Sequence, residues 1–198
     1  MGQRLNVEIW NNGKALANAY YHWSAYTGSS AEITNTALNY INSNPIQDDN
    51  YLLYAIRILE ATGAGLTKDE VEYAKKISAL DGATFAECNC RIEGLLAISK
   101  DGIQETRNWQ EGTVFIFLDE KRISFRVFFT EKSWEWVKEQ REYYGNQEAS
   151  ARDLDVVSFN FDDIKFDEWQ IHYDFLVSRK DDPFVCELEK SDVITPIY

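Results

Sequence analysis

The sequence predicts an α+β fold, with a mainly antiparallel sheet and four to five helices in a single compact domain. Neighbouring segments in which apolar and polar residues alternate indicate β-hairpins. Segments with capping residues and helical spacing lie between the first hairpin and the later ones. With 198 residues, of which 44% are hydrophobic, the chain is long enough to bury one core. We expect one domain over 1–198, with possible halves at 1–82 (hairpin and helices) and 90–198 (hairpin-rich and acidic).

The first predicted element is an N-terminal hairpin. Leu5, Val7 and Ile9 alternate with polar residues, as in a strand with one buried face. The segment 11–13, Asn-Asn-Gly, tolerates the positive φ angles of a tight turn, and the apolar run 15–23 follows it. These residues predict two antiparallel strands.

Three helices are predicted next. Capping boxes, in which a hydroxyl and a carboxylate three residues apart satisfy the free amides of a first turn, occur at Ser29/Glu32 and Thr67/Glu70. The polar cluster at 48–50 caps the helix between them. The glycines at 62–67 superficially resemble a phosphate-binding loop, but its lysine is missing, so we interpret this segment as a helix end. The predicted helices cover about 30–42, from 51 to the stop at Gly63, and from 68 to Ile77.

Strands dominate the second half. Apolar residues occupy every second position from Ile123 to Phe129, after a turn at 119–121. Strands joined by short turns pair antiparallel, which favours a mainly antiparallel sheet over a doubly wound parallel one. The predicted elements are a strand at 94–99, a short helix at 101–110, strands at 113–118 and 122–129, a helix from 130 to 145, and strands at 156–161, 169–177 and 184–188.

Composition and cysteine content indicate a cytoplasmic protein without a membrane partner. No run of about 18 apolar residues is present that would span a bilayer. The first residues lack the apolar core of a secretory signal. Cys88, Cys90 and Cys186 are too few and too unevenly spaced for a disulfide framework, which agrees with a reducing compartment.

The negative charge is concentrated near the C-terminal end. The net charge is −13, and residues 151–198 hold 12 of the 33 acids but 5 of the 20 bases. Such a surface repels DNA, RNA and anionic membranes, so we expect no direct nucleic-acid binding but a protein partner with a basic surface. Solvated acids also keep small domains soluble, and this interpretation stays open. The expected partner-binding acids are Asp153, Asp155, Asp162, Asp163, Asp167, Glu168, Glu187 and Glu189.

An aromatic segment surrounds one of the two histidines. If Tyr20, His22, Ser24 and Tyr26 line a pocket, His22 can act as a general base or contact a nucleotide. Alternatively, the aromatics are the buried face of a strand and His22 is simply hydrogen-bonded. Ser24 lacks the Gly-x-Ser-x-Gly turn of many hydrolases, and we assign no catalytic residue. A binder or hydrolase of a small molecule or nucleotide signal is therefore the alternative function.

We expect no cofactor and no metal. A single residue separates Cys88 from Cys90, whereas structural zinc sites usually have two to four residues between such cysteines. The sequence also lacks the Asp-x-Asp-x-Asp-Gly loop that binds calcium.

Three segments resemble small uncharacterised acidic proteins from phages and prophages of Gram-positive bacteria. They are Gly2–Ile9 (GQRLNVEI), Ala17–Tyr26 (ANAYYHWSAY) and Arg91–Ser99 (RIEGLLAIS). The likeness covers about the first two-thirds of the chain and carries over no established activity. It implies the host bacterial cytoplasm as location. It favours an interaction protein that binds and inhibits a host protein, such as a nucleic-acid-binding defence effector, which would be an anti-CRISPR or other anti-defence function.

Overall fold

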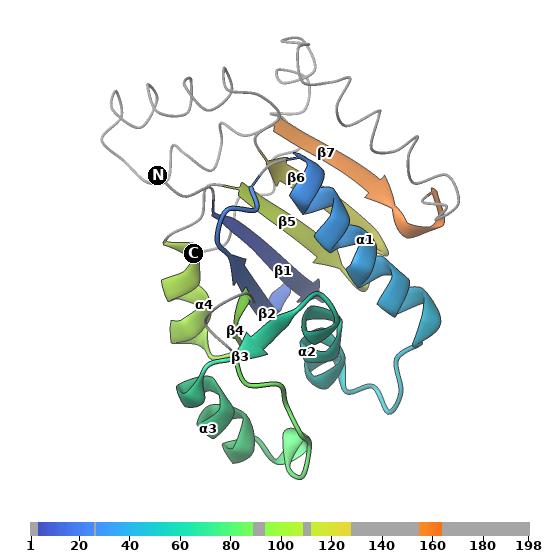
Figure 1. The fold of residues 1–198 in the computed structure, drawn as a ribbon. Coiled ribbons are helices and arrows are strands. Elements are labelled where there is room, and N and C mark those ends of the chain that lie inside the picture. The colour runs from blue at the N-terminus through green and yellow to red at the C-terminus, as the bar shows by residue number, and fades with distance from the viewer. Residues whose placement is uncertain (1–3, 26, 89–93, 109–111, 128–154, 164–198) are drawn as a thin grey trace.

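The computed structural model describes residues 4–25, 27–88, 94–108, 112–127 and 155–163 (Figure 1). Within these ranges the fold is α+β, as predicted, with one mixed sheet of seven strands and four α-helices. The predicted helix at 130–145 and the predicted strands at 169–177 and 184–188 lie outside them. The strands are β1 (Leu5–Asn11), β2 (Lys14–Tyr21), β3 (Ala64–Leu66), β4 (Gly94–Ala97), β5 (Gly112–Phe117), β6 (Arg122–Val127) and β7 (Asp155–Asn160). The helices are α1 (Thr27–Ser43), α2 (Tyr51–Ala61), α3 (Lys68–Lys76) and α4 (Lys100–Arg107), with short 3-10 helices η1 (Ser78–Leu80) and η2 (Phe161–Asp163).

Most neighbouring strands of the sheet run antiparallel, which agrees in outline with the prediction. The strand order is β3-β4-β2-β1-β5-β6-β7. The pairs β1–β2, β2–β4, β5–β6 and β6–β7 are antiparallel, whereas β1–β5 and β3–β4 are parallel. The sequence does not predict the parallel pairs, because each joins strands that are separated by helices.

The β1–β2 turn has the conformation that its residues predict. Asn12 and Gly13 have φ angles of 49° and 71°. A two-residue type I′ hairpin requires this left-handed conformation at both central positions. Asn11 and Lys14 pair directly across the turn, which fixes the start of β2.

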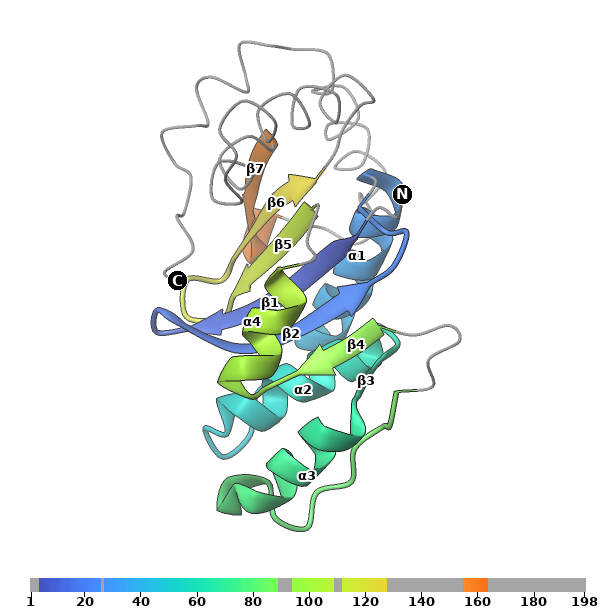
Figure 2. The same cartoon turned by 90° about the vertical axis from the view of Figure 1, so that its left-hand side faces the viewer.

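Helices cover the two faces of the sheet unequally. α1 and α2 lie on one face (Figure 1), and α4 lies on the other (Figure 2). Beneath α1 and α2, Leu5, Val7 and Ile9 of β1 are fully buried. They belong to one aliphatic core with Ile56 and Leu59 of α2. This core makes the sheet a stable platform for the residues at its ends.

The predicted N-cap residue is right for α2 and α3 and wrong for α1, and of the capping box at Thr67/Glu70 only the Thr67 half forms. Asn50 Oδ1 and Thr67 Oγ1 each accept a hydrogen bond from the amide three residues further on, at 3.1 and 3.3 Å. α1 begins at Thr27, so Ser29 lies inside its first turn. A serine is tolerated there because the first amides of a helix have no intrahelical acceptor in any case.

Glu70 has a contact that its capping-box spacing does not predict. Its carboxylate accepts hydrogen bonds from the Ile98 and Ser99 amides at 2.7 and 2.9 Å, and from the Ser99 hydroxyl. Ser99 Oγ in turn accepts from the Gly102 amide at 3.1 Å and caps α4. Glu70 therefore ties α3 to the start of α4.

A short strand follows α2, where the sequence predicts only a helix end. Gly63, with φ of 85°, terminates α2 as expected. The next three residues, Ala64–Leu66, pair parallel with β4. Three residues are too few to show a period-two pattern. At Gly65, a Cβ would lie 2.6 Å from the Cys88 amide nitrogen, so the close approach of the two segments requires glycine.

Candidate interaction site

A buried pair of charged groups lies where α4 packs on β1. Glu8 of β1, only 1% exposed, accepts hydrogen bonds from Arg107 Nε and Nη2 at 2.8 and 2.7 Å. The indole Nε1 of Trp10 donates to the same carboxylate at 2.9 Å. Buried charges are costly unless they are paired and hydrogen-bonded in this way. The pair fixes α4 on β1, so its role is structural.

Exposed carboxylates gather at the end of the sheet where β1, β5 and β7 finish. The β5–β6 turn presents Asp119 and Glu120, and η2 presents Asp162 and Asp163. The first residue of η2 donates its amide to a carbonyl of the β5–β6 turn at 2.7 Å, so the two turns are held together. These four residues are called the acidic end.

Neighbouring cations neutralise only part of the acidic end. Arg122 donates to Glu120 Oε2 from Nη2 at 2.7 Å and from Nε at 3.0 Å. Asp163 accepts from the neutral amide of Asn160 at 2.9 Å. Among the described residues, the exposed Lys121 of the same turn and the exposed Lys14 of the neighbouring β1–β2 turn bring the cations at this end to three, against four carboxylates. A net negative charge therefore remains on an ordered part of the surface.

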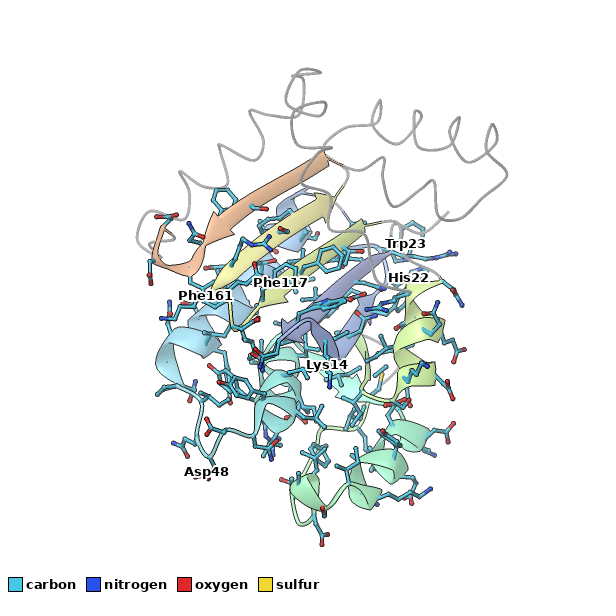
Figure 3. All side chains as sticks on the ribbon, turned by 180° about the vertical axis from the view of Figure 1, so that it is seen from behind. Lys14, His22, Trp23, Asp48, Phe117 and Phe161 are labelled. Atoms are coloured by element: carbon cyan, nitrogen blue, oxygen red, sulfur yellow. The ribbon has the colours of Figure 1, made fainter. Side chains whose placement is uncertain are left out.

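Exposed aromatic rings lie at the opposite end of the sheet. His22 and Trp23 follow β2 directly and lie far from Phe161 of η2 (Figure 3). Both are exposed, Trp23 at 56%, and their ring centroids lie 4.9 Å apart in an edge-to-face contact. Trp23 has a φ of 66°, a left-handed conformation that is rare for a bulky residue. Tyr20, His22 and Trp23 are called the aromatic end.

The residues of the predicted histidine pocket do not form a serine–histidine pair. Tyr20 is buried, and its hydroxyl lies 2.9 Å from Nδ1 of the exposed His22. Ser24 Oγ donates to the backbone oxygen of His22 at 3.4 Å instead of the imidazole. Tyr26 lies outside the described residues. A pocket that the structure does describe lies between α1 and α2, and none of these residues lines it.

The predicted acidic surface is divided by the fold. Asp162 and Asp163 lie at the acidic end, whereas Asp155 begins β7 at the opposite end, roughly 15–20 Å away by strand geometry. Asp119 and Glu120 belong to the same surface because β6 pairs with β7, which brings the β5–β6 turn next to η2. The sequence does not predict this pairing of two strands that lie far apart along the chain. The other expected acids, Asp153, Asp167, Glu168, Glu187 and Glu189, lie outside the described residues.

In the ranges that the structure describes, no three His, Cys, Asp or Glu side chains are grouped to hold a metal ion. None of the helices in these ranges has the length and apolar character that a membrane crossing requires. Cys88 lies beside β3, where its amide donates to the Leu66 oxygen at 2.9 Å, and Cys90 and Cys186 lie outside the described ranges.

Comparison with protein-family models, curated proteins and solved structures gives no match for this chain. Its own surfaces are therefore the guide to its function.

Proposed function

We propose that this chain is an interaction protein that binds a basic surface of a host protein through its acidic end. The observation that carries this proposal is the placement of four exposed carboxylates on two turns that are hydrogen-bonded to each other. Charges on ordered turns keep a fixed pattern that a partner can match. The acidic end therefore suits recognition in addition to solubility.

Charge at the acidic end speeds association and orients the partner. Attraction between exposed charges extends over about 8 Å at physiological salt, the Debye length. An exposed ion pair contributes only about 0–1 kcal/mol once formed, so a stable complex needs apolar contacts as well. Trp23 offers such a contact, because it is largely exposed and tryptophan is enriched among binding hot spots.

One interface of ordinary size can include both ends of the sheet. The strands are roughly 20 Å long and β2 and β7 are four strand spacings, roughly 19 Å, apart, so the two ends lie roughly 28 Å from each other. A standard interface covers about 800 Å² on each partner, which is roughly 28 Å across. The acidic end would orient the partner and the aromatic end would anchor it.

A protein groove that binds DNA or RNA is the partner surface that this arrangement suits best. Such grooves present lysine and arginine in positions that match phosphates, and fixed carboxylates can occupy the same positions. The partner in this proposal is a nucleic-acid-binding defence effector of a bacterial host, such as a CRISPR effector. The inhibitor would be encoded by a phage and act in the host cytoplasm, an origin that the resemblance of the N-terminal segments supports.

Neutralising the acidic end should abolish most partner binding. The variant combines Asp119→Asn, Glu120→Gln, Asp162→Asn and Asp163→Asn. We expect capture of the partner from a bacterial host lysate to fall about tenfold or more, because the steering charges are lost. The midpoint of unfolding should stay close to that of the unmodified chain, because surface substitutions usually change stability little. Double-stranded DNA should compete with the unmodified chain for the captured partner.

A matched control removes the same amount of charge from other exposed positions. The control combines four exposed positions outside the β5–β6 turn and η2: Glu32→Gln on α1, Glu72→Gln on α3, Asp81→Asn after η1 and Glu87→Gln beside β3. This control should capture the partner as the unmodified chain does. Equal losses in the two variants would show that net charge alone matters, and the acidic-end proposal would then be wrong.

A further inference from the structure

A pocket of about 350 Å³ lies between the end of α1 and the start of α2. This volume falls at the lower end of the range of about 300–1,000 Å³ that small-molecule sites occupy. None of its lining residues belongs to the acidic end or the aromatic end. The lining includes Tyr40 and Ser43 from α1, Gln47 from the connecting loop, and Leu53, Tyr54 and Arg57 from α2.

Two tyrosines form an aromatic wall in this pocket. The Tyr40 and Tyr54 rings have centroids 6.3 Å apart and planes inclined at 44°. The Tyr54 hydroxyl donates to the Ile41 oxygen at 3.3 Å, which ties α2 to α1 and fixes the wall. Burial, with a smaller contribution from Tyr40, raises the pKa of Tyr54, so its phenol is neutral at physiological pH. A planar ring can therefore pack on a fixed, uncharged surface.

Arg57 is the only charged residue among the described residues that line the pocket. Its Nη1 donates to Glu60 Oε2, and its guanidinium lies over the Phe85 ring, 5.6 Å from the centroid. Glu60 is itself fixed, because its Oε1 accepts from the Ala86 amide at 2.7 Å. The Arg57 guanidinium is thus positioned before any ligand binds. It has five N–H donors, and the bond to Glu60 uses only part of them.

Neutral hydrogen-bonding groups complete the lining. The Ser43 hydroxyl and the Gln47 side-chain amide belong to exposed lining residues and can each donate and accept hydrogen bonds. Both can bond to the polar edge of a ring. Asp48 and Asp49 belong to the same loop and are exposed, but they do not line the pocket.

We propose that this pocket binds a small planar ring that carries one anionic group, such as an aromatic carboxylate or a nucleoside monophosphate. The ring packs on Tyr40 and Tyr54, and the anion bonds to Arg57. The net charge of −13 creates a field that repels anions from most of the surface. An anion therefore needs a positioned cation, and Arg57 supplies it in this pocket. This site is independent of the proposed interaction with a host protein.

Calorimetric titration of the full chain with matched probes tests the site. Adenosine monophosphate and hydroxybenzoate carry both a ring and an anion. Adenosine and phenol lack the anion, and inorganic phosphate and acetate lack the ring. At least one of the first two probes should bind about tenfold or more tightly than both of its matched partners. Tight binding of adenosine monophosphate would identify the ligand class as a nucleotide, and tight binding of hydroxybenzoate would identify it as an aromatic acid. If neither probe exceeds its partners, the proposal is wrong.

Variants locate the binding in this pocket. Arg57→Gln should weaken the anionic probe about tenfold and leave the neutral ring unchanged. Gln47→Trp, at an exposed loop position, should fill the pocket and abolish binding of every ring without affecting the fold. Asp48→Asn with Asp49→Asn should tighten anion binding about twofold, because two nearby repelling charges are removed. Unchanged affinity in Arg57→Gln or in Gln47→Trp would overturn the proposal.

Discussion

The two ends of the sheet present opposite chemistry. The acidic end has four exposed carboxylates on ordered turns, and the aromatic end has two exposed rings, one of them on a left-handed backbone. Charges act over several ångströms but each contributes little once screened. A tryptophan acts only on contact, yet it can bury about 150–250 Å². The comparison teaches that long-range approach and short-range anchoring are separate tasks in this chain.

The largest expected effect comes from the middle of the sheet, which holds both ends in place. Glu8→Ala removes the carboxylate that faces the buried guanidinium of Arg107. We expect the free energy of unfolding to fall by about 3–5 kcal/mol, as measured by urea denaturation. Both ends should then lose partner binding together, in proportion to the fraction unfolded.

A double variant separates the loss of a charge pair from the creation of an unpaired charge. Glu8→Leu with Arg107→Met removes both charges and fills the space with apolar groups. Part of the lost stability should return, because apolar replacement of a buried ion pair is often close to neutral. The rest stays lost, because the Trp10 indole N–H loses its acceptor in both variants. An unfolding midpoint of Glu8→Ala equal to that of the unmodified chain would contradict a structural role for this pair.

A smaller effect is expected at the aromatic end, where Trp23→Gly removes the anchoring ring. Partner binding should weaken about 30-fold, which corresponds to about 2 kcal/mol, while its dependence on salt stays unchanged. Glycine adopts the φ of 66° without strain, so the free energy of unfolding should be unchanged or rise by up to about 1 kcal/mol. Affinity is measured by titration and stability by urea denaturation.

Tyr73→Ala is the control for Trp23→Gly. Tyr73 on α3 is the other large apolar residue that is exposed in the described ranges, at 41%. Its loss removes a similar amount of exposed aromatic surface from a different place, so binding should stay at the level of the unmodified chain. Equal losses in the two variants would mean that the aromatic end has no special part in anchoring.

The elements with local signals could be predicted from the sequence. The β1–β2 turn follows from Asn12 and Gly13, whose tolerance of positive φ is a property of the residues themselves. The caps at Asn50 and Thr67 likewise depend on contacts three residues away. The α+β class and the mainly antiparallel sheet follow from such local patterns.

Contacts between distant segments could not be predicted. A glutamate that alternates with apolar residues gives the same pattern whether it faces water or, like Glu8, a buried arginine 99 positions further along the chain. The period-two pattern also says nothing about which end of the sheet a carboxylate reaches. For this reason the sequence groups Asp155 with Asp162, although they lie at opposite ends of β7, and it leaves out Asp119 and Glu120.

The salt dependence of the affinity for the captured partner tests the central claim most directly. The dissociation constant is measured from about 50 to about 300 mM salt for the unmodified chain and for the variant with a neutral acidic end. The steering role predicts that salt weakens binding steeply in the unmodified chain and only slightly in the variant, because screening acts on charges that the variant lacks. Equal salt dependence in the two proteins would contradict the claim that the acidic end recognises the partner.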